Sequence, residues 1–167
     1  MELHLVLGSN GSGKSLHAES LAVESGAPLL YIATMVPQNE ENHRRIEKHR
    51  LQRQGKGFQT VEIPWGLEDA PVTEETVVLL EDVSNLLANG MFQQGADETA
   101  ALEKILALAG RCRRLIAVSI SGLSDEGYSG ETADYIHALA RLNEELSLRA
   151  CRVTKMQNGT PALLKSE

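Results

Sequence analysis

Near its start the chain reads Gly8-Ser9-Asn10-Gly11-Ser12-Gly13-Lys14-Ser15, which fits the pattern G-x-x-x-x-G-K-[ST]. An apolar run precedes this octapeptide and an amphipathic stretch follows it, as the motif requires. Its glycines let backbone N–H groups point at phosphate oxygens, and the helix that starts at Lys14 adds its positive end. We therefore expect the loop to bind ATP or GTP. Lys14 would reach the β- and γ-phosphates, and the Ser15 hydroxyl would hold Mg²⁺.

Outward from this loop, strand-like runs alternate with helix-like stretches along the whole chain. The expected strands are Glu2–Leu7, Pro28–Ala33, Gln59–Ile63, Thr76–Glu81, Arg114–Ile120 and Cys151–Met156. The expected helices are Lys14–Ser25, about Gln38–Gln52, Val83–Phe92, Asp97–Arg111 and Glu131–Leu148. This alternation predicts an α/β fold of the P-loop NTPase type, with a mainly parallel sheet flanked by helices and one domain over residues 1–167.

Two glycine-containing segments predict irregular structure. Asn158-Gly159 separates the short apolar runs Val153–Met156 and Ala162–Leu164, which favours a C-terminal antiparallel hairpin. The segment Ser121–Gly130 is rich in glycine and serine, and we expect it to be a mobile loop.

Composition narrows the classes of function. The chain is 42% hydrophobic and 23% charged, which is ordinary for a globular domain, and its net charge of -7 argues against broad nucleic-acid binding. No apolar run approaches the roughly 20 residues of a membrane span, and the N-terminus is too short before the loop for a signal peptide. We expect a cytoplasmic protein. Cys112 and Cys151 lack metal-type spacing, and we expect small buried groups without a disulfide.

A second metal-binding group is expected at the end of an apolar strand. Val77–Leu80 leads directly into Glu81 and Asp82. An acid in this place holds Mg²⁺ directly or through water in many P-loop proteins. Since side chains alternate along a strand, the two acids should diverge. We assign Glu81 to the metal and Asp82 to the N-cap of the following helix.

A cluster of cations surrounds His49 in this acidic protein. Arg45, His49 and Arg53 are spaced by four residues and can share one face of a helix, which suits a polyphosphate. A neutral imidazole there could attack a nucleotide α-phosphate while the cations stabilise the developing charge. The spacing alone favours the simpler interpretation, a charged surface helix with an incidental histidine.

Several other side chains have weaker signals. Thr34 ends the second strand, where open α/β sheets bind ligands, and is a candidate nucleotide contact. Trp65 could cover a base, although packing is the simpler role. We expect structural or surface roles for the remaining histidines in regular elements, which are His4, His17 and His137.

Taken together, these motifs resemble the bifunctional adenosylcobinamide kinase / adenosylcobinamide-phosphate guanylyltransferase family of cobalamin assembly. Besides the loop, the matching motifs are Tyr31-Ile32-Ala33-Thr34; Arg45-Ile46-Glu47-Lys48-His49-Arg50 with Arg53, Thr60 and Glu62; Leu79-Leu80-Glu81-Asp82 with Asn89; and Arg141-Leu142-Asn143-Glu144. The resemblance implies that ATP or GTP phosphorylates the aminopropanol hydroxyl of a corrinoid. GMP then passes from GTP through a histidine to the corrinoid phosphate.

The resemblance also implies roles for individual residues. His49 would carry GMP, while Glu62 and Arg53 would belong to the nucleotide site. Lys14 would serve the phosphates, and Ser15 would serve the phosphates and Mg²⁺. The family further implies a homotrimer with active sites near subunit boundaries.

The chain departs from the family pattern at several positions, which include Met35, Gln54 and Phe58. Gly11 also stands where the family tends to have an arginine, and Ser119-Ile120-Ser121-Gly122 stands in place of N-E-V-G. The change at residues 119–122 lies where the acceptor is expected to bind. Two alternatives therefore stay open: a kinase acting on another small alcohol, and a nucleotide-binding regulatory protein without chemistry.

Overall fold

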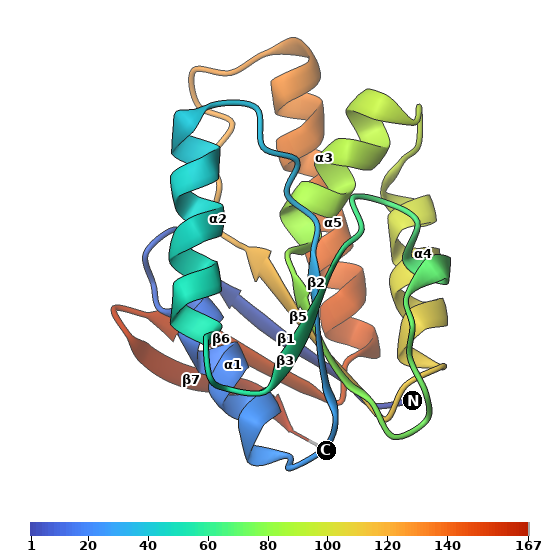
Figure 1. Ribbon diagram of the computed structural model, residues 1–167. Helices are drawn as coiled ribbons and strands as arrows, with labels where there is room; N and C mark the ends of the chain where they lie inside the picture. Colours follow the sequence, from blue (N-terminus) through green and yellow to red (C-terminus); the bar gives the residue numbers. More distant parts are fainter. Residues whose placement is uncertain (167) are drawn as a thin grey trace.

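The phosphate-binding loop follows a central strand of a seven-stranded sheet with the order β3-β2-β4-β5-β1-β6-β7 (Figure 1). The computed structural model describes residues 1–166. Its strands are β1 (Leu3–Gly8), β2 (Leu29–Ala33), β3 (Phe58–Glu62), β4 (Val77–Glu81), β5 (Arg114–Ile120), β6 (Arg152–Gln157) and β7 (Thr160–Ser166). The first six are parallel, and β7 pairs antiparallel with β6. The predicted α/β fold with its terminal hairpin is confirmed.

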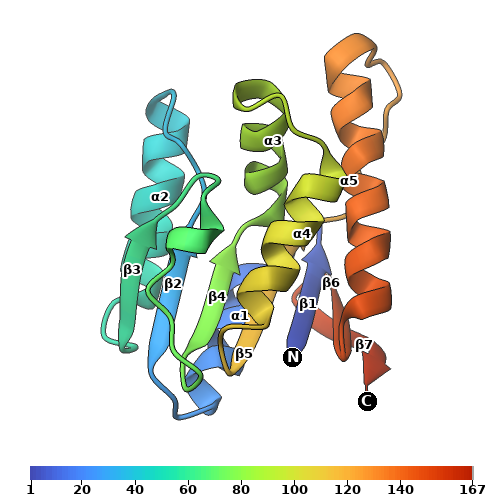
Figure 2. The ribbon, with the colours of Figure 1, turned by 90° about the vertical axis from the view of Figure 1, so that its right-hand side faces the viewer.

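Helices lie on both faces of this sheet (Figure 2). They are α1 (Lys14–Glu24), α2 (Glu40–Arg53), α3 (Val83–Gln93), α4 (Glu98–Ala109) and α5 (Gly130–Arg149). The larger core cluster joins α3, α4 and α5 to one face of the sheet, and a smaller one joins α1 to the other. Arg53 is the one buried residue of α2. This helix extends beyond the carboxyl ends of the strands (Figure 2).

The pattern of β4 explains why it lies inside the sheet. All five of its residues are buried. Val78 and Leu80 belong to the core on the α3–α5 face, while Val77 and Leu79 belong to the core on the α1 face. A strand covered on both faces needs consecutive apolar residues, as the sequence predicted. This arrangement brings Glu81 and Asp82 to the carboxyl edge of the sheet.

The element boundaries agree with the predictions to within a few residues, with one omission. A short 3-10 helix, η1 (Leu67–Asp69), was not expected from the sequence. Ser121–Gly130 is irregular up to Gly130, where α5 begins. Within residues 1–166 both cysteines are free, with Cys112 buried and Cys151 half-buried. No helix in this range has the length and apolar character needed to cross a membrane.

Trp65 has a packing role. Its ring lies against the core beneath α3 and α4, with Lys104 Nζ 5.0 Å from the ring centroid. Gly90 of α3 is buried, and a Cβ placed on it would lie 2.7 Å from Trp65 Cη2. Glycine at position 90 is therefore required by the close approach of the indole, and Trp65 has the packing role that the sequence favoured.

This contact generates a stability prediction. Alanine normally stabilises a helix interior by about 1 kcal/mol over glycine, but Gly90→Ala should destabilise this protein by about 1–3 kcal/mol because the new methyl overlaps the indole. Urea unfolding followed by circular dichroism measures the effect. In a Trp65→Ala background the same substitution should become neutral or stabilising. A stabilising effect in the wild-type background would contradict this packing account.

Candidate active site

The loop between β1 and α1 has the conformation that its glycines permit. A Cβ on Gly8 would lie 3.2 Å from Met156 Cβ, so the strand end has no room for a side chain. Gly13 has φ +89° directly before α1, in the left-handed region that glycine favours. Within the loop, Ser12 N–H donates to the Ser9 carbonyl at 3.2 Å. The Gly159 N–H of the β6–β7 turn donates to the Ser12 carbonyl at 3.1 Å.

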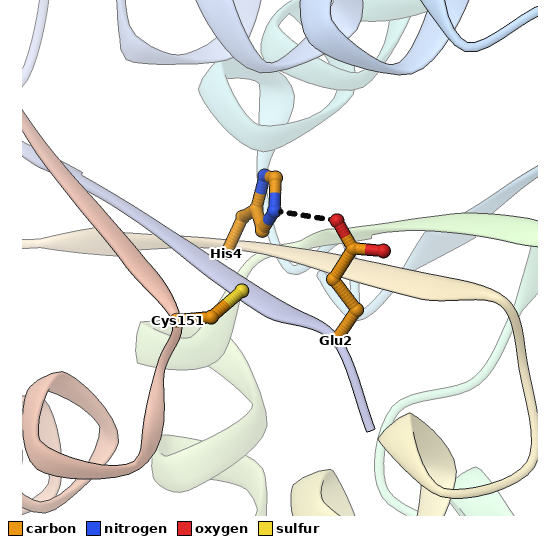
Figure 3. Close-up of side chains that lie close together, drawn as sticks. All are labelled: Glu2, His4 and Cys151. Atoms are coloured by element: carbon orange, nitrogen blue, oxygen red, sulfur yellow. Dashed lines mark hydrogen bonds and ion pairs between the residues drawn. The ribbon is translucent and has the colours of Figure 1, made fainter. Parts of the chain in front are cut away.

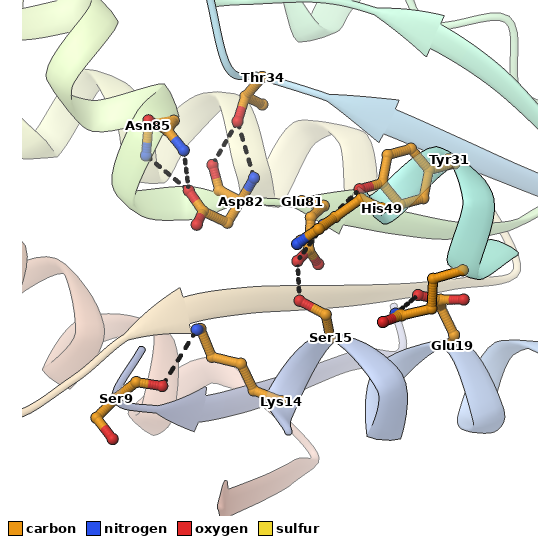
Figure 4. A network of polar contacts seen from close by, with 11 residues as sticks. Ser9, Lys14, Ser15, Glu19, Tyr31, Thr34, His49, Glu81, Asp82 and Asn85 are labelled. Atoms are coloured by element: carbon orange, nitrogen blue, oxygen red, sulfur yellow. Dashed lines mark hydrogen bonds and ion pairs between the residues drawn. The ribbon is translucent and has the colours of Figure 1, made fainter. Parts of the chain in front are cut away.

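The loop opens into a cavity of about 450 Å³ that collects most of the predicted site. Lys14 and Ser15 line it from α1, His49 lines it from α2, and Glu81 and Asp82 line it from the end of β4. Lys14 is 8% exposed, and its Nζ donates to the Ser9 carbonyl at 3.3 Å. The structure therefore brings the phosphate loop, the candidate metal acid and the candidate nucleophile into one cavity (Figure 4).

Glu81 and Asp82 diverge, as the strand geometry predicted. Ser15 Oγ donates to Glu81 Oε1, whereas Asp82 Oδ1 accepts from Asn85 N–H at 2.8 Å and from Asn85 Nδ2 at 3.0 Å (Figure 4). Asp82 is the N-cap of α3, which confirms its assigned role. Burial, reinforced by the charge of Asp82, raises the pKa of Glu81 to about 8.

The surroundings of Glu81 fit a divalent cation. Its second oxygen, Oε2, is buried and has no hydrogen-bond partner among residues 1–166. A carboxylate beside a hydroxyl supplies the hard oxygen ligands that Mg²⁺ prefers. A bound cation would also favour the ionised carboxylate, against the effect of burial. Ser15 and Glu81 are thus the residues that would hold the metal.

His49 faces this acid from α2. Its Nδ1 lies 3.6 Å from Glu81 Oε1 and 3.5 Å from the Tyr31 hydroxyl. Burial, followed by the positive charges of Arg45, Arg53, Lys14 and Lys48, lowers the pKa of His49. The imidazole is therefore neutral near pH 7 and has a lone pair available. Since Nδ1 faces Tyr31 and Glu81, Nε2 is the ring nitrogen left for other contacts.

Arg53 acts on this histidine through Tyr31. The Arg53 guanidinium carbon lies 3.9 Å from the centroid of the Tyr31 ring, and its Nε donates to Thr60 Oγ1 at 3.2 Å. Tyr31 is 3% exposed, so the ring is fixed between the sheet and α2. Arg53, the last residue of α2, is buried and does not line the cavity. The family motifs around Tyr31 and Thr60 thus position His49.

Two other predicted nucleotide contacts, Thr34 and Glu62, do not line the cavity. Thr34 is fully buried, and its Oγ1 is 2.8 Å from both the backbone N and the carbonyl O of Asp82. Asn89 Nδ2 donates to the Thr34 carbonyl at 2.8 Å and to the Pro64 carbonyl at 2.9 Å. Thr34 and Asn89 therefore hold the corner at Glu81–Asp82. Glu62 is exposed at the end of the edge strand β3.

Four residues that line the cavity had no predicted role there: Leu16 of α1, and Glu41, Lys48 and Gln52 of α2. Lys48 and Gln52 line it beside Arg45 and His49. Their spacing of three or four residues on one helix was a visible signal, because such positions share a face. The face of α2 that lines the cavity is therefore wider than the row of Arg45, His49 and Arg53 predicted from the sequence.

The altered segment after β5 is held by an internal network. Ser119 is fully buried and donates to Asn143 Oδ1 at 2.6 Å, and Asn143 Nδ2 donates to the Ile120 carbonyl at 2.9 Å. Ser84 Oγ accepts from Ile120 N–H at 3.0 Å. The R-L-N motif of α5 therefore has a structural partner in this chain, even though N-E-V-G is replaced.

A second polar cluster lies at the opposite ends of the strands (Figure 3). The ligand-type atoms of Glu2, His4 and Cys151 lie within 4.8 Å of one another. Each already has a protein partner: Glu2 Oε1 accepts from Arg114 Nε at 2.8 Å and lies 3.1 Å from His4 Nε2, and Cys151 donates to the Leu3 carbonyl. We assign a structural role to this cluster, in agreement with the structural role expected for His4.

Comparisons with known proteins agree with this geometry. The profile of the family described as Cobinamide kinase / cobinamide phosphate guanyltransferase matches residues 4–164. The bifunctional adenosylcobalamin biosynthesis protein CobU of Escherichia coli is 31% identical over 96% of this chain and 98% of its own length. CobP of Pseudomonas aeruginosa, with the same description, is 32% identical over 98% and 97%.

A fold likeness extends to more distant proteins. The chain of a type III secretion ATPase from pathogenic bacteria superposes with a TM-score of 0.55 at 10% identity, covering 93% of this chain and 51% of that one. This likeness shows the P-loop NTPase fold alone. The profile match and the two full-length relatives show more: this chain belongs to the cobinamide kinase / cobinamide phosphate guanyltransferase family of transferases.

Proposed function

We propose that this enzyme phosphorylates the hydroxyl of adenosylcobinamide with ATP or GTP, and then transfers GMP from GTP to the resulting phosphate through His49. The observation that carries this proposal is that His49 and the phosphate loop line the same cavity, with Glu81 between them. Family membership supplies the corrinoid acceptor.

In the guanylyl step, His49 Nε2 attacks the α-phosphorus of GTP. A phosphorus–nitrogen bond forms, the bond to the bridging oxygen breaks, and pyrophosphate leaves with the electron pair. The Nδ1 side of the ring is oriented by Tyr31 and Glu81. An oxygen of the corrinoid phosphate then attacks the same phosphorus, and the bond to Nε2 breaks. Arg45 and Lys48, which line the cavity, neutralise the charge on the transferring group.

In the kinase step, the loop from Gly8 to Ser15 holds the triphosphate with its backbone N–H groups. Lys14 leaves its contact with the Ser9 carbonyl and donates to the β- and γ-phosphates. Ser15 and Glu81 would hold Mg²⁺, which would neutralise charge on the phosphates when bound. The oxygen of the acceptor hydroxyl attacks the γ-phosphorus, and its proton is released to water. The bond from the γ-phosphorus to the bridging oxygen breaks, and nucleoside diphosphate leaves with the electron pair.

Three further assignments belong to this proposal. Glu62 contacts the nucleotide, Thr34 supports the nucleotide site through Asp82, and Arg53 supports it through Tyr31. The exposed position of Glu62 on an edge strand suits a contact completed by a second subunit. Following the family resemblance, we also propose that the enzyme is a homotrimer and that it is located in the cytoplasm.

The network around Ser119 favours one alternative, a kinase acting on a different small alcohol. The side chains of Ser119 and Asn143 form a hydrogen bond with each other and therefore have a structural role in this chain. Incubation with adenosylcobinamide and GTP, followed by mass analysis of the corrinoid and of the protein, separates the two functions. A corrinoid gaining phosphate and then GMP supports the main proposal.

The first prediction concerns the nucleophile. With GTP labelled on the α-phosphate, wild type should acquire an acid-labile, base-stable label, as a phosphoramidate does, and His49→Ala should abolish it. Phosphorylation of the corrinoid should persist, because Lys14, Ser15 and Glu81 are untouched. The matched control is His43→Ala, an exposed histidine of the same helix outside the cavity. A label that survives His49→Ala would assign the nucleophile elsewhere.

The second prediction concerns the metal. Glu81→Gln removes the acid that we assign to Mg²⁺ while keeping its shape. The Mg²⁺ concentration for half-maximal kinase activity should rise by about 10- to 100-fold, by comparison with other metal-site substitutions. Steady-state assays over a Mg²⁺ series measure this shift. The exposed Glu74→Gln serves as control, and an equal response of both variants would remove Glu81 from the metal site.

The third prediction concerns assembly. Sedimentation equilibrium should give a mass three times the 18.2 kDa of one chain. A mass equal to that of one chain, at concentrations where the enzyme is fully active, would rule out the trimer.

A further inference from the structure

A second groove opens beside the phosphate cavity, between α2 and α3. Its volume is about 340 Å³, and Met35, Val36 and Phe92 supply its apolar surface. Val36 is 42% exposed and Phe92 is 47% exposed. The groove lies at the carboxyl edge of the sheet, the edge at which open α/β sheets bind their ligands.

Carboxamides dominate the rest of the groove. Five of its lining side chains are amides, namely Gln38, Asn42, Asn85, Asn89 and Gln93, and none of its lining residues is charged. The phosphate cavity differs, because charged side chains of both signs line it: the cations Lys14, Arg45 and Lys48 and the acids Glu41, Glu81 and Asp82. The groove therefore suits a neutral ligand with hydrogen-bonding groups, whereas the cavity suits a charged one.

These amides retain hydrogen-bonding capacity toward a ligand. Asn42 uses its Oδ1 to accept from Gln38 N–H at 3.1 Å, and no bond within residues 1–166 occupies its Nδ2. Asn85 and Asn89 use their Nδ2 groups within the protein, and their Oδ1 atoms can still accept. Gln93, in the last turn of α3, is exposed. Since a primary amide both donates and accepts, the groove can pair with other primary amides.

The groove and the cavity share a wall. Asn85 lines the groove and donates to Asp82, which lines the cavity. On α2, Asn42 lines the groove and the preceding Glu41 lines the cavity. A ligand seated in the groove can therefore extend one arm past Asp82 toward the phosphates.

We propose that this groove is the acceptor subsite and that it binds the amide-bearing rim of the corrin macrocycle. The inference rests on the function proposed above and deepens it. A corrin ring carries primary amides on an apolar macrocycle, which matches amide side chains around the exposed Phe92 and Val36. The aminopropanol arm of the same ligand reaches the phosphate cavity across the Asp82–Asn85 pair.

The test is direct binding to the full-length protein. Equilibrium dialysis with adenosylcobinamide, followed by the visible absorbance of the corrin, gives its Kd without any turnover. Gln93→Ala and Phe92→Ala should each raise this Kd by about 5- to 10-fold, the size expected for losing one hydrogen bond or one apolar contact. The matched control is Gln94→Ala, the neighbouring glutamine outside the groove lining, which should stay within about twofold.

Two further readouts separate this inference from the proposed function. The Kd for GTP and the labelling of His49 by GTP alone should be unchanged in Gln93→Ala and Phe92→Ala. A GTP Kd that rises in these variants would assign the groove to the base and overturn the inference. So would a corrinoid Kd that neither variant changes, or a wild-type protein that binds no corrinoid. Absence of label on wild type, with corrinoid binding still sensitive to Gln93, would overturn the proposed function alone.

Discussion

The contact between the Ser15 hydroxyl and the buried carboxylate of Glu81 is the constraint around which this structure is organised. A carboxylate removed from water is costly unless polar groups surround it. Ser15 supplies such a polar group to Glu81. It can reach the acid because β1 and β4 lie on either side of β5 and end at the same edge of the sheet. That edge places the loop after β1, the acid at the end of β4 and the histidine of α2 around one space.

The sequence predicted the parts of this arrangement that depend on local pattern. The octapeptide predicted the phosphate-binding loop, and the apolar run Val77–Leu80 predicted a strand covered by helices on both faces. Asp82 could be recognised as the N-cap of a helix because its partner, Asn85, is three residues away. Partners distant in sequence could not be found in this way. Thr34 bonds to the backbone of Asp82 and Arg53 stacks on Tyr31, so the contacts of these two predicted nucleotide residues involve partners far away in the sequence.

The phosphate cavity and the groove between α2 and α3, both at the carboxyl edge of the sheet, differ in the charge of the residues that line them. Cations and acids together line the space beside the phosphate loop, whereas uncharged amides line the groove between α2 and α3. The Asp82–Asn85 pair stands between them and also begins α3. Neither lining includes Ser119, whose side chain is held to α5 by Asn143.

The backbone hydrogen bond from Gly159 to the Ser12 carbonyl joins the loop to a turn encoded at the far end of the sequence. During synthesis the loop residues leave the ribosome first, but this bond must wait for residue 159. β6, which flanks β1 in the sheet, also arrives late. The nascent chain therefore cannot complete the hydrogen bonding of its phosphate-binding loop until its last residues have been synthesised.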